Sequence, residues 1–242
     1  MKAHQKKVRD NLAERDGHEN LFGKWWEYID LDLKKTEIKP ISVATARTII
    51  NRYEWLGCMP AICMFQYGIY FEDNCGGVVV FSREYAENLG VWDKFGFTGK
   101  ILILSRGACL HWTPKNTGSK LIMGAIEQLP EQYEVITATV DELAGEIGTI
   151  YQACNFHYIG VMSPEFADNL AVVIGGKLYT SMSLRHKFGT EDKKKLLERF
   201  PNAEIVQQKG KGRYFYFRKN KRAYQKSIQH LIKPYPKRGE NE

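Results

Sequence analysis

Hydrophobic and polar positions divide this chain into segments with two different periods. Apolar side chains recur every three or four residues behind Ser42, a good helix N-cap, and predict an amphipathic helix that ends near Leu56. Further along, short apolar runs bounded by polar turns predict strands. The run Val78–Phe81 has no polar alternation, which is typical of a strand that is buried on both faces.

Together these segments predict a mixed α/β fold. The predicted strands are Ile62–Phe71, Gly76–Phe81, Ile101–Leu104, Val135–Val140, Leu170–Ile174, Lys177–Met182, Glu204–Gln208 and Arg213–Arg218, the last two paired as a hairpin. The predicted later helices are Leu121–Leu129, Ile147–Phe156, a segment from Thr190 to Phe200, and Lys221–Ile232. Between Lys100 and Gly160 the order strand, loop, helix, strand, helix forms a βαβα unit. Such units bind ligands at loops beyond strand ends, so we expect the active centre here.

The first 40 residues differ from the rest of the chain. They are polar, charged and weakly periodic, apart from aromatic side chains around Trp25 and Trp26. This arm could stack on nucleic acid, but docking onto the domain by its aromatics is the simpler interpretation. We therefore expect an arm at 1–40, a catalytic core at 41–176, and a basic C-terminal extension at 177–242 that belongs to the same domain.

Composition narrows the class of protein. With 242 residues and 43% hydrophobic side chains, the chain can build one large core. It has neither an apolar run of about 18 residues, which a membrane span needs, nor an apolar segment behind its basic N-terminus. The five cysteines are odd in number and contain no Cys-x-x-Cys pair, which predicts free thiols in the cytoplasm and disfavours a zinc ribbon.

Charge is unevenly distributed along the chain. From Lys177 to the end there are 18 Lys and Arg against 6 Asp and Glu, or +12. Subtracting these from totals of 35 and 28 leaves 17 against 22, or −5, for residues 1–176. A basic third on a mildly acidic body is typical of a protein that binds a polyanion in one region. A lysine-rich solvated surface is the alternative.

The polar loop Thr113–Lys120 has the chemistry of an anion site. A glycine-containing turn at a helix N-terminus offers backbone N–H groups, and lysines stand beside it. An ordinary capped turn is the alternative. The residues expected to hold a cofactor are His111, Pro114, Lys115, Asn116, Thr117, Gly118 and Ser119.

The segment after the fourth predicted strand is more specific. The run Tyr151-Gln-Ala-Cys-Asn155-Phe156 resembles the GNAT N-acetyltransferases, in which a Tyr-x-x-x-Gly-Phe tyrosine protonates the departing coenzyme A thiolate. The resemblance implies a coenzyme A thioester, similar to acetyl-coenzyme A, as cofactor. Asn155 replaces the usual glycine, a mild change because asparagine tolerates left-handed backbone geometry. The alternative for Tyr151 is a buried phenol bonded to a carbonyl.

A closer resemblance, over roughly residues 42–238, is to the phage Mom DNA-modification proteins. It is carried by Arg106-Gly-Ala-Cys-Leu-His111-Trp112-x-Pro114-Lys115-Asn116, by Ala144-Gly-Glu-Ile-Gly-Thr-Ile-Tyr151-Gln-Ala153, and by the C-terminal Tyr235-Pro236-Lys237. It implies conversion of adenine N6 in double-stranded DNA to a methylcarbamoyl derivative, which protects phage DNA from restriction in the host cytoplasm. It also implies Arg106, Asp141 and Tyr151 as the catalytic residues.

The side chains of Arg106, Asp141 and Tyr151 suit the modification of an amine. Arg106 and Asp141 are expected at or just after strand ends, where α/β sheets gather polar groups. Arg106 could hold a phosphate or carboxylate, Asp141 could orient or deprotonate an exocyclic amine, and Tyr151 could act as a general acid. A salt bridge between neighbouring strand ends is the alternative for the first two.

Mom proteins have been linked to iron, often with a histidine at the end of the first helix. This chain has Asn51-Arg52-Tyr53-Glu54-Trp55 there, and its six histidines show no ligand spacing. The resemblance thus makes iron possible, the residues of this chain do not support an iron site, and the metal ligands stay unknown.

The basic third is expected to contact DNA phosphates, an attraction that weakens with salt. The side chains expected to do so are Arg185, Lys187, Arg213, Arg218, Lys219 and Arg222. Tyr214 and Tyr216 share one face of a strand, and one face of that strand is expected to be core while the other could stack on a base. Reaching adenine N6 requires base flipping.

The sequence thus predicts a GNAT-like α/β domain with a basic C-terminal extension that modifies DNA adenine. Two alternatives stay open. One is an N-acetyltransferase acting on a protein or a small amine, which the basic third disfavours. The other is a non-catalytic DNA-binding protein, which Asp141 and Tyr151 disfavour. Oligomeric state is open, a dimer included.

Overall fold

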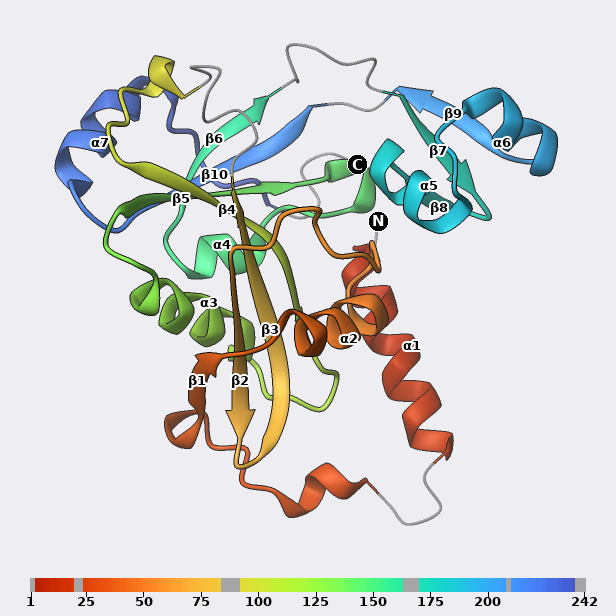
Figure 1. The fold of residues 1–242 in the computed structure, drawn as a ribbon, viewed down its shortest axis with the longest axis horizontal. Coiled ribbons are helices and arrows are strands. Elements are labelled where there is room, and N and C mark those ends of the chain that lie inside the picture. The colour runs from red at the N-terminus through yellow and green to blue at the C-terminus, as the bar shows by residue number, and fades with distance from the viewer. Residues whose placement is uncertain (1–2, 20–23, 84–91, 163–169, 208–209, 238–242) are drawn as a thin grey trace.

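The computed structural model describes residues 3–19, 24–83, 92–162, 170–207 and 210–237 (Figure 1). A seven-stranded sheet in the order β1-β2-β3-β4-β5-β10-β6 forms its centre. Its strands are β1 (Glu37–Pro40), β2 (Phe65–Phe71), β3 (Asn74–Arg83), β4 (Lys100–Cys109), β5 (Tyr133–Val140), β6 (His157–Met162) and β10 (Lys211–Phe217). Only β4 and β5 pair in parallel; the other neighbours pair antiparallel. The predicted mixed α/β fold is confirmed.

Helices cover both faces of this sheet. Helix α3 (Thr117–Gln128) buries Leu121, Ala125 and Ile126 in a cluster with Leu102 and other strand residues. On the opposite face, α2 (Val43–Tyr53) buries Ala46, Ile49 and Ile50 against Val78 and Val80. Strand β3 is therefore buried on both faces, as its unbroken apolar run predicts. Ser42 caps α2 by accepting a hydrogen bond from the Thr45 N–H at 3.0 Å, as expected.

The second half of the sheet is closed by the C-terminal region. Strand β10 lies between β5 and β6, and Tyr214 and Phe215 are both fully buried, on opposite faces. Phe215 packs with Phe217 and with Tyr224 and Ile228 of α7 (Lys221–Ile228). Both faces of β10 are thus core, so the stacking of bases on Tyr214 is excluded by its burial.

A smaller unit lies between β6 and β10 in the chain. Its three-stranded sheet has the order β8-β7-β9, formed by β7 (Leu170–Ile174), β8 (Lys177–Tyr179) and β9 (Glu204–Gln207). Helices α5 (Ser181–Phe188) and α6 (Lys193–Arg199) complete its own core around Leu184 and Leu196. The hairpin predicted for β9 and β10 is wrong, because β9 pairs with β7 while the aromatic β10 finds burial in the central sheet.

The remaining elements connect the arm and the site. Helix α1 (His4–Glu19) contacts α2, and η1 (Trp25–Tyr28) and η2 (Leu33–Lys35) follow before β1 joins the central sheet. Residues expected to lie in the arm thus include one strand of the core. The other short helices are η4 (Asp93–Phe95), η5 (Glu142–Ala144), α4 (Thr149–Ala153) and η6 (Gln229–Leu231). None of the helices in these described ranges is both long and apolar enough to cross a membrane.

Helix α4 is shorter than its apolar pattern predicts. The expected helix from Ile147 to Phe156 is limited to Thr149–Ala153 by left-handed residues at both ends. Gly148 has φ +69° at the start and Asn155 has φ +57° at the end, so the expected left-handed geometry of Asn155 is confirmed. A Cβ on Gly148 would come within 2.6 Å of the Tyr214 ring, which explains the glycine there.

Candidate active site

The site begins where β4 and β5 separate. Their parallel pairing runs from Lys100 and Tyr133 to Ile103 and Thr137, and beyond it β4 pairs with β3 alone among the described residues. At the same point the β3–β4 register shifts by one residue, so that Ser105 is an extra residue on β4. Such a bulge re-aims the side chains that follow it. The sheet is therefore split at its centre, next to a bulge.

Arg106 directly follows this bulge. Strand β4 continues to Cys109, so Arg106 lies inside the strand rather than at its end. Its partner across the strands is Val80, which packs against α2, and this places Arg106 on the α2 face. Its Nε donates to the Cys58 carbonyl oxygen at 2.7 Å and its Nη1 to that of Ser105 at 2.6 Å. The guanidinium is thus anchored to the segment that follows α2.

Glu54 stands next to this guanidinium at the end of α2. It is only 8% exposed, and its Oε2 accepts hydrogen bonds from the Leu56 and Gly57 N–H groups at 2.9 and 3.0 Å. Burial raises the pKa of Glu54 to about 7, although the charge of Arg106 opposes this shift. A carboxyl group with this pKa can accept or release a proton near neutral pH.

Asp141 and Glu146 lie on the turn that leaves β5. Asp141 follows Val140 directly and is 6% exposed, with its Oδ2 3.9 Å from Nζ of Lys211 on β10. Its backbone N–H donates to Oε2 of Glu146 at 3.4 Å, and its carbonyl accepts from the Glu146 N–H at 3.1 Å. Burial and the Asp141 charge raise the pKa of Glu146, while hydrogen bonds from the Asp141 N–H and the Trp55 side chain oppose the shift.

Tyr151 reaches the split from the other face of the sheet. Its ring packs 5.5 Å from that of Phe156 and 5.4 Å from that of Tyr214, in the α3-side core. Burial raises the pKa of its phenol, and the charges of Glu146 and Glu54 raise it further. The charges of these carboxylates and of Arg106 all act on the Tyr151 pKa, so the groups lie within electrostatic range of its phenol. We call Glu54, Arg106, Asp141, Glu146 and Tyr151 the split-sheet cluster.

The C-terminal region holds α4 in place. The Tyr214 hydroxyl donates to the Ile147 carbonyl at 2.7 Å, and Gln152 Nε2 donates to the Ile147 and Pro236 carbonyls at 2.8 and 3.2 Å. The Tyr235 hydroxyl donates to the Phe156 carbonyl at 2.7 Å. The terminal Tyr-Pro-Lys sequence thus braces the turn and helix that carry Glu146 and Tyr151.

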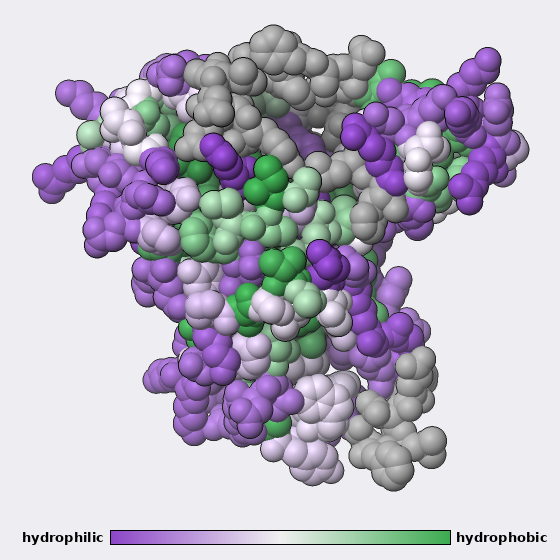
Figure 2. Space-filling view, in the orientation of Figure 1, coloured by the Kyte–Doolittle hydropathy of each residue, from purple (hydrophilic) through white to green (hydrophobic). Residues whose placement is uncertain are grey.

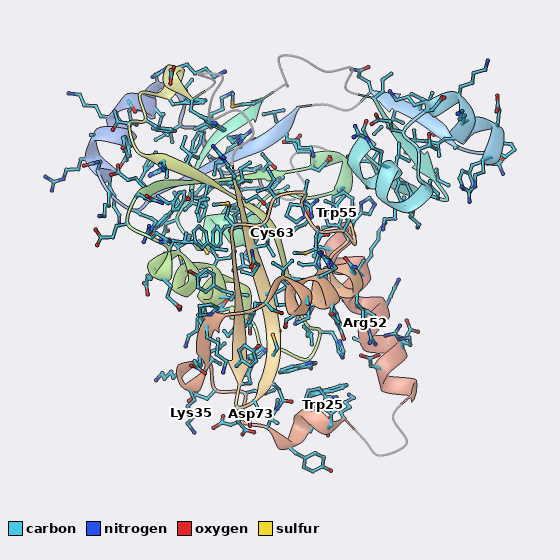
Figure 3. All side chains as sticks on the ribbon, in the orientation of Figure 1. Trp25, Lys35, Arg52, Trp55, Cys63 and Asp73 are labelled. Carbon is cyan, nitrogen blue, oxygen red and sulfur yellow. The ribbon has the colours of Figure 1, made fainter. Side chains whose placement is uncertain are left out.

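Two other parts of the chain fix the segment between Tyr53 and Trp55. Gln5 of α1 donates from Nε2 to the Tyr53 carbonyl at 2.6 Å and accepts from the Trp55 N–H at 3.0 Å. Lys177 of β8 donates to the Trp55 carbonyl at 2.7 Å. Trp55 and Cys63, labelled in Figure 3, mark the connection from α2 to β2. The surface of this connection is apolar in Figure 2. Two of its hydrophobic residues are exposed, Ile62 by 40% and Met64 by 38%.

The predicted cofactor residues fall into two groups. Thr117, Gly118 and Ser119 form the first turn of α3, and Asn116 precedes it with φ +71°. The Thr117 hydroxyl donates to the Pro114 carbonyl at 2.8 Å and that of Ser119 to the Asn116 carbonyl at 3.0 Å, while Lys115 is exposed. A Cβ on Gly118 would lie 2.6 Å from Ile150 Cδ1, so the α3 N-terminus adjoins α4.

His111 is separate from that turn. Its side chain is 4% exposed, and its Nε2 lies 3.5 Å from Asp16 Oδ2 of α1. Arg9 of α1 donates to the His111 and Thr113 carbonyls at 3.1 and 2.9 Å. The side chain thus faces the arm.

The six predicted DNA contacts do not gather on one surface. Arg185 is exposed on α5 and pairs with Glu191 at 2.8 Å, and Lys187 donates to the Tyr179 hydroxyl at 2.8 Å. Figure 1 places this unit and α7 at opposite ends of the molecule. Near α7, Lys219 pairs with Glu131 at 2.9 Å and Arg222 is exposed.

The other two predicted contacts serve the fold. Arg213 donates to the Thr137 hydroxyl at 3.0 Å and lies over the Trp92 ring. Arg218 donates to the Leu129, Pro130 and Tyr133 carbonyls at 2.7 to 2.8 Å. Both guanidinium groups thus bind partners within the protein. Arg218 does so at the turn between α3 and β5, and Arg213 does so on the central sheet.

Metal binding finds no support in the side chains. Within the described part of the chain, no group of three or more His, Cys, Asp or Glu side chains is arranged to hold a metal ion. The split-sheet cluster instead contains Arg106, whose cationic guanidinium has no lone pair to offer a metal. The residues that the structure describes therefore offer iron no ligand set.

Sequence reasoning predicts Arg106, Asp141 and Tyr151 as site residues, but it missed Glu54 and Glu146, whose charges act on the pKa of Tyr151. Glu54 carries a signal of its own, because the macrodipole disfavours an acidic side chain at a helix C-terminus. Glu146 lies inside the Ala-Gly-Glu string yet has no such signal. Its contacts with Asp141 and Trp55 arise only from the turn after β5.

Comparison with known proteins gives one family. The model of the Mom protein family matches residues 35–237. No curated protein matches the chain in sequence. Among solved structures, an IAA acetyltransferase from Bacillus cereus ATCC 14579 aligns with TM-score 0.42 and 12% identity over 75% of this chain and 99% of its own. A GNAT family acetyltransferase from Elizabethkingia anophelis with acetyl-CoA bound aligns with TM-score 0.43 and 10% identity, over 75% and 97%.

Proposed function

This chain belongs to the Mom protein family, and we propose that it modifies the N6 amine of adenine in double-stranded DNA. The proposed product is the methylcarbamoyl derivative, and the proposed role is protection of phage DNA from host restriction. The observation that carries the proposal is the split-sheet cluster. Three carboxyl groups, a guanidinium and a phenol come from the elements around the separation of β4 and β5, and charges within this set act on the pKa values of Glu54, Glu146 and Tyr151.

The cluster contains both a proton acceptor and a proton donor. Glu54 has a pKa of about 7, so near neutral pH it can take the proton that the N6 amine loses. Tyr151 keeps its proton because burial and neighbouring carboxylates raise its pKa, so it can serve as the acid that protonates a leaving group. Asp141, buried beside Lys211, is placed to accept a hydrogen bond from the amine and orient it.

A coenzyme A thioester is the proposed cofactor; it would supply an activated acyl group, whose C–S bond breaks to release the thiolate as its carbon bonds N6, while the amide nitrogen of the methylcarbamoyl product would have to come from a separate amine donor. The fit rests on two features. Beyond Ile103, β4 pairs with β3 alone among the described residues, which leaves one edge toward the split. The first turn of α3, with Gly118 and Ser119, can hold phosphate at its N–H groups, with Lys115 exposed nearby.

The DNA surface is proposed to include α7 and the tail. Residues 210–237 carry nine Lys and Arg and no Asp or Glu. On α7, Tyr224 and Ile228 face the core, while Lys221, Arg222 and Lys226 are exposed. Figure 2 shows the hydrophilic side chains over this end of the molecule. Phosphate binding by these side chains supports DNA as the substrate over a small amine.

Expression in bacteria tests the proposal directly. Plasmid DNA from cells that express the chain should contain a heavier adenine nucleoside by mass spectrometry, and the mass difference separates a methylcarbamoyl from an acetyl group. The Asp141→Ala variant, expressed to the same level, should leave adenine unchanged. Unmodified adenine in both cultures despite folded protein would exclude this function and leave the non-catalytic DNA-binding alternative.

A further inference from the structure

Three backbone groups on either side of Glu54 bond to side chains from distant parts of the chain. The Tyr53 carbonyl accepts from Gln5 Nε2 at 2.6 Å, and the Trp55 N–H donates to Gln5 Oε1 at 3.0 Å. The Trp55 carbonyl accepts from Lys177 Nζ at 2.7 Å. Gln5 lies on α1 and Lys177 on β8, so both units hold the segment that carries Glu54. We call Gln5 and Lys177 the Glu54 bracket.

Glu54 occupies a place that a carboxylate normally avoids. Helix α2 ends at Tyr53, and the last carbonyls of a helix lack partners within it and form the negative end of its dipole. A free glutamate here would turn its charge toward water, but Glu54 is only 8% exposed. Its Oε2 turns back to the N–H groups of Leu56 and Gly57, at 2.9 and 3.0 Å. The burial of this carboxyl group therefore depends on how firmly the backbone on both sides of it is held.

We propose that Gln5 and Lys177 are positioning residues for the reaction, which hold Glu54 in the split-sheet cluster so that it can take the proton of the amine. The proposal rests on the proposed function, in which Glu54 is the proton acceptor. Both residues act through the backbone around Glu54 and not on the substrate. Helix α1 and the smaller unit are thereby parts of the active centre, although Gln5 precedes residue 35, where the match to the family begins.

The bracket also orients a second carboxyl group through Trp55, which Figure 3 labels. The Trp55 side chain is buried, and its hydrogen bond to Glu146 lowers the pKa of that carboxyl group against the effect of burial. His4, next to Gln5 on α1, packs on the same side chain with ring centroids 5.4 Å apart. Because the Trp55 N–H and carbonyl are both held, the donor that serves Glu146 is held as well.

Several elements bring charged and titratable groups to Glu54. Burial is the largest influence on its pKa; Arg106 of β4 lowers this pKa, and Glu146, after β5, raises it. On α4, Tyr151 lies within range of the Glu54 charge. On α1, burial lowers the pKa of His4, so this ring is neutral near pH 7, and β8 brings the bracket lysine itself. Because burial dominates, loosening the bracket should admit water and lower the Glu54 pKa toward its usual value near 4.3.

Carbon NMR of the full chain, labelled at the glutamate side-chain carboxyl carbons, follows this group directly. The signal that is absent from Glu54→Gln identifies Glu54, and in wild type it should titrate with a midpoint of about 7. Gln5→Met keeps the length and helix propensity of the side chain but removes both hydrogen bonds. The Glu54 midpoint should then be lower by about one pH unit or more. Modification of plasmid adenine in cells should fall about five- to tenfold, because the proton acceptor is misplaced.

Gln128→Met is the matched control for Gln5→Met. Gln128 Nε2 also donates to a backbone carbonyl, that of Ile38 at 2.7 Å, but it does so from α3 to β1. This variant should leave both the Glu54 midpoint and adenine modification unchanged. An equal shift of the midpoint in Gln5→Met and Gln128→Met would show a general loosening of the fold and would overturn the proposal.

Lys177→Met tests the other half of the bracket. Loss of the lysine charge alone would raise the Glu54 midpoint, whereas loss of its hydrogen bond to the Trp55 carbonyl should lower it. We expect the lower midpoint, and a higher one would remove Lys177 from the bracket. Lys194→Met, at an exposed position on α6 of the same unit, is the control and should leave the midpoint unchanged.

The NMR measurement keeps this proposal separate from the proposed function. A lower midpoint in Gln5→Met supports the bracket even if wild-type cells contain no modified adenine, a result that would exclude the function alone. Modified adenine in wild type, with the midpoint unshifted in both Gln5→Met and Lys177→Met, would leave the function standing and overturn the bracket. A lower midpoint with undiminished adenine modification would show that the bracket does not serve the reaction, and would overturn the positioning role.

Discussion

Three residues of the split-sheet cluster were predicted from the sequence, and so was the basic C-terminal region that contains segment 210–237, yet the fold treats the two differently. In the cluster, Arg106 on β4, Asp141 after β5 and Tyr151 on α4 come from three elements around the place where β4 and β5 separate. The basic segment instead divides its charge, because Arg218 and Arg213 bond within the protein while Arg222 faces solvent. Strand ends converge by topology, whereas a count of basic residues says nothing of where each side chain points.

The largest effect is expected at Tyr151. Tyr151→Phe keeps the ring and its packing but removes the proton donor, so modification of plasmid adenine should fall by about 10²- to 10⁴-fold. Quantitative mass spectrometry of the nucleosides measures it. Tyr158→Phe, a change to another buried tyrosine of the same core, serves as the control and should keep activity. Similar losses in both variants would mean that Tyr151 acts through packing, and would remove it from the chemistry.

Because of Glu54, both the stability of the protein and its activity should depend on pH. Its folded pKa of about 7 exceeds the unfolded value near 4.3, so the native state binds the extra proton between these values. The free energy of unfolding should therefore fall as pH rises from about 4 to about 7. In Glu54→Gln this part of the fall, roughly 3 kcal/mol, should be absent.

Urea denaturation across this pH range measures the stability, and modification of plasmid or added DNA measures the activity. Wild-type activity should rise as pH passes about 7, because Glu54 then accepts protons, and Glu54→Gln should lose that rise. Glu127→Gln, at an exposed position on α3, is the control. An unchanged stability profile in Glu54→Gln would show that its carboxyl group is not the one that titrates.

Arg218 and Lys219 form a matched pair within the basic segment. Arg218 donates to three carbonyl oxygens at 2.7 to 2.8 Å, so Arg218→Ala should lower the free energy of unfolding by about 2 to 4 kcal/mol. Lys219 pairs with an exposed Glu131, so Lys219→Ala should leave the urea midpoint unchanged. Equal stability of the two variants would mean that the basic segment contributes only surface charge, against the division described above.

Much of the fold was predictable because local pattern and topology agree. The apolar run at Val78 and the cap at Ser42 are determined by neighbouring residues, and both predictions are confirmed. Strand β10 was placed in the wrong pair because its partners, β5 and β6, lie far away in sequence. Glu54 was missed for a related reason. Its raised pKa comes from burial, which outweighs the opposing charge of Arg106, and no local pattern around residue 54 contains this burial.

The smallest effect, on DNA affinity, is expected at Arg222, whose charge faces solvent. Arg222→Ala should weaken DNA binding only a few-fold, and the slope of log affinity against log salt should decrease by about one for each phosphate that the variant no longer neutralises. Fluorescence anisotropy over a salt series measures both. Arg213→Lys is the control, because Arg213 bonds Thr137 and lies over Trp92, so its slope should match wild type. If Arg213→Lys lowered the slope and Arg222→Ala did not, DNA phosphate would be bound through β10 rather than through α7. The basic segment would then join the split-sheet cluster as one surface.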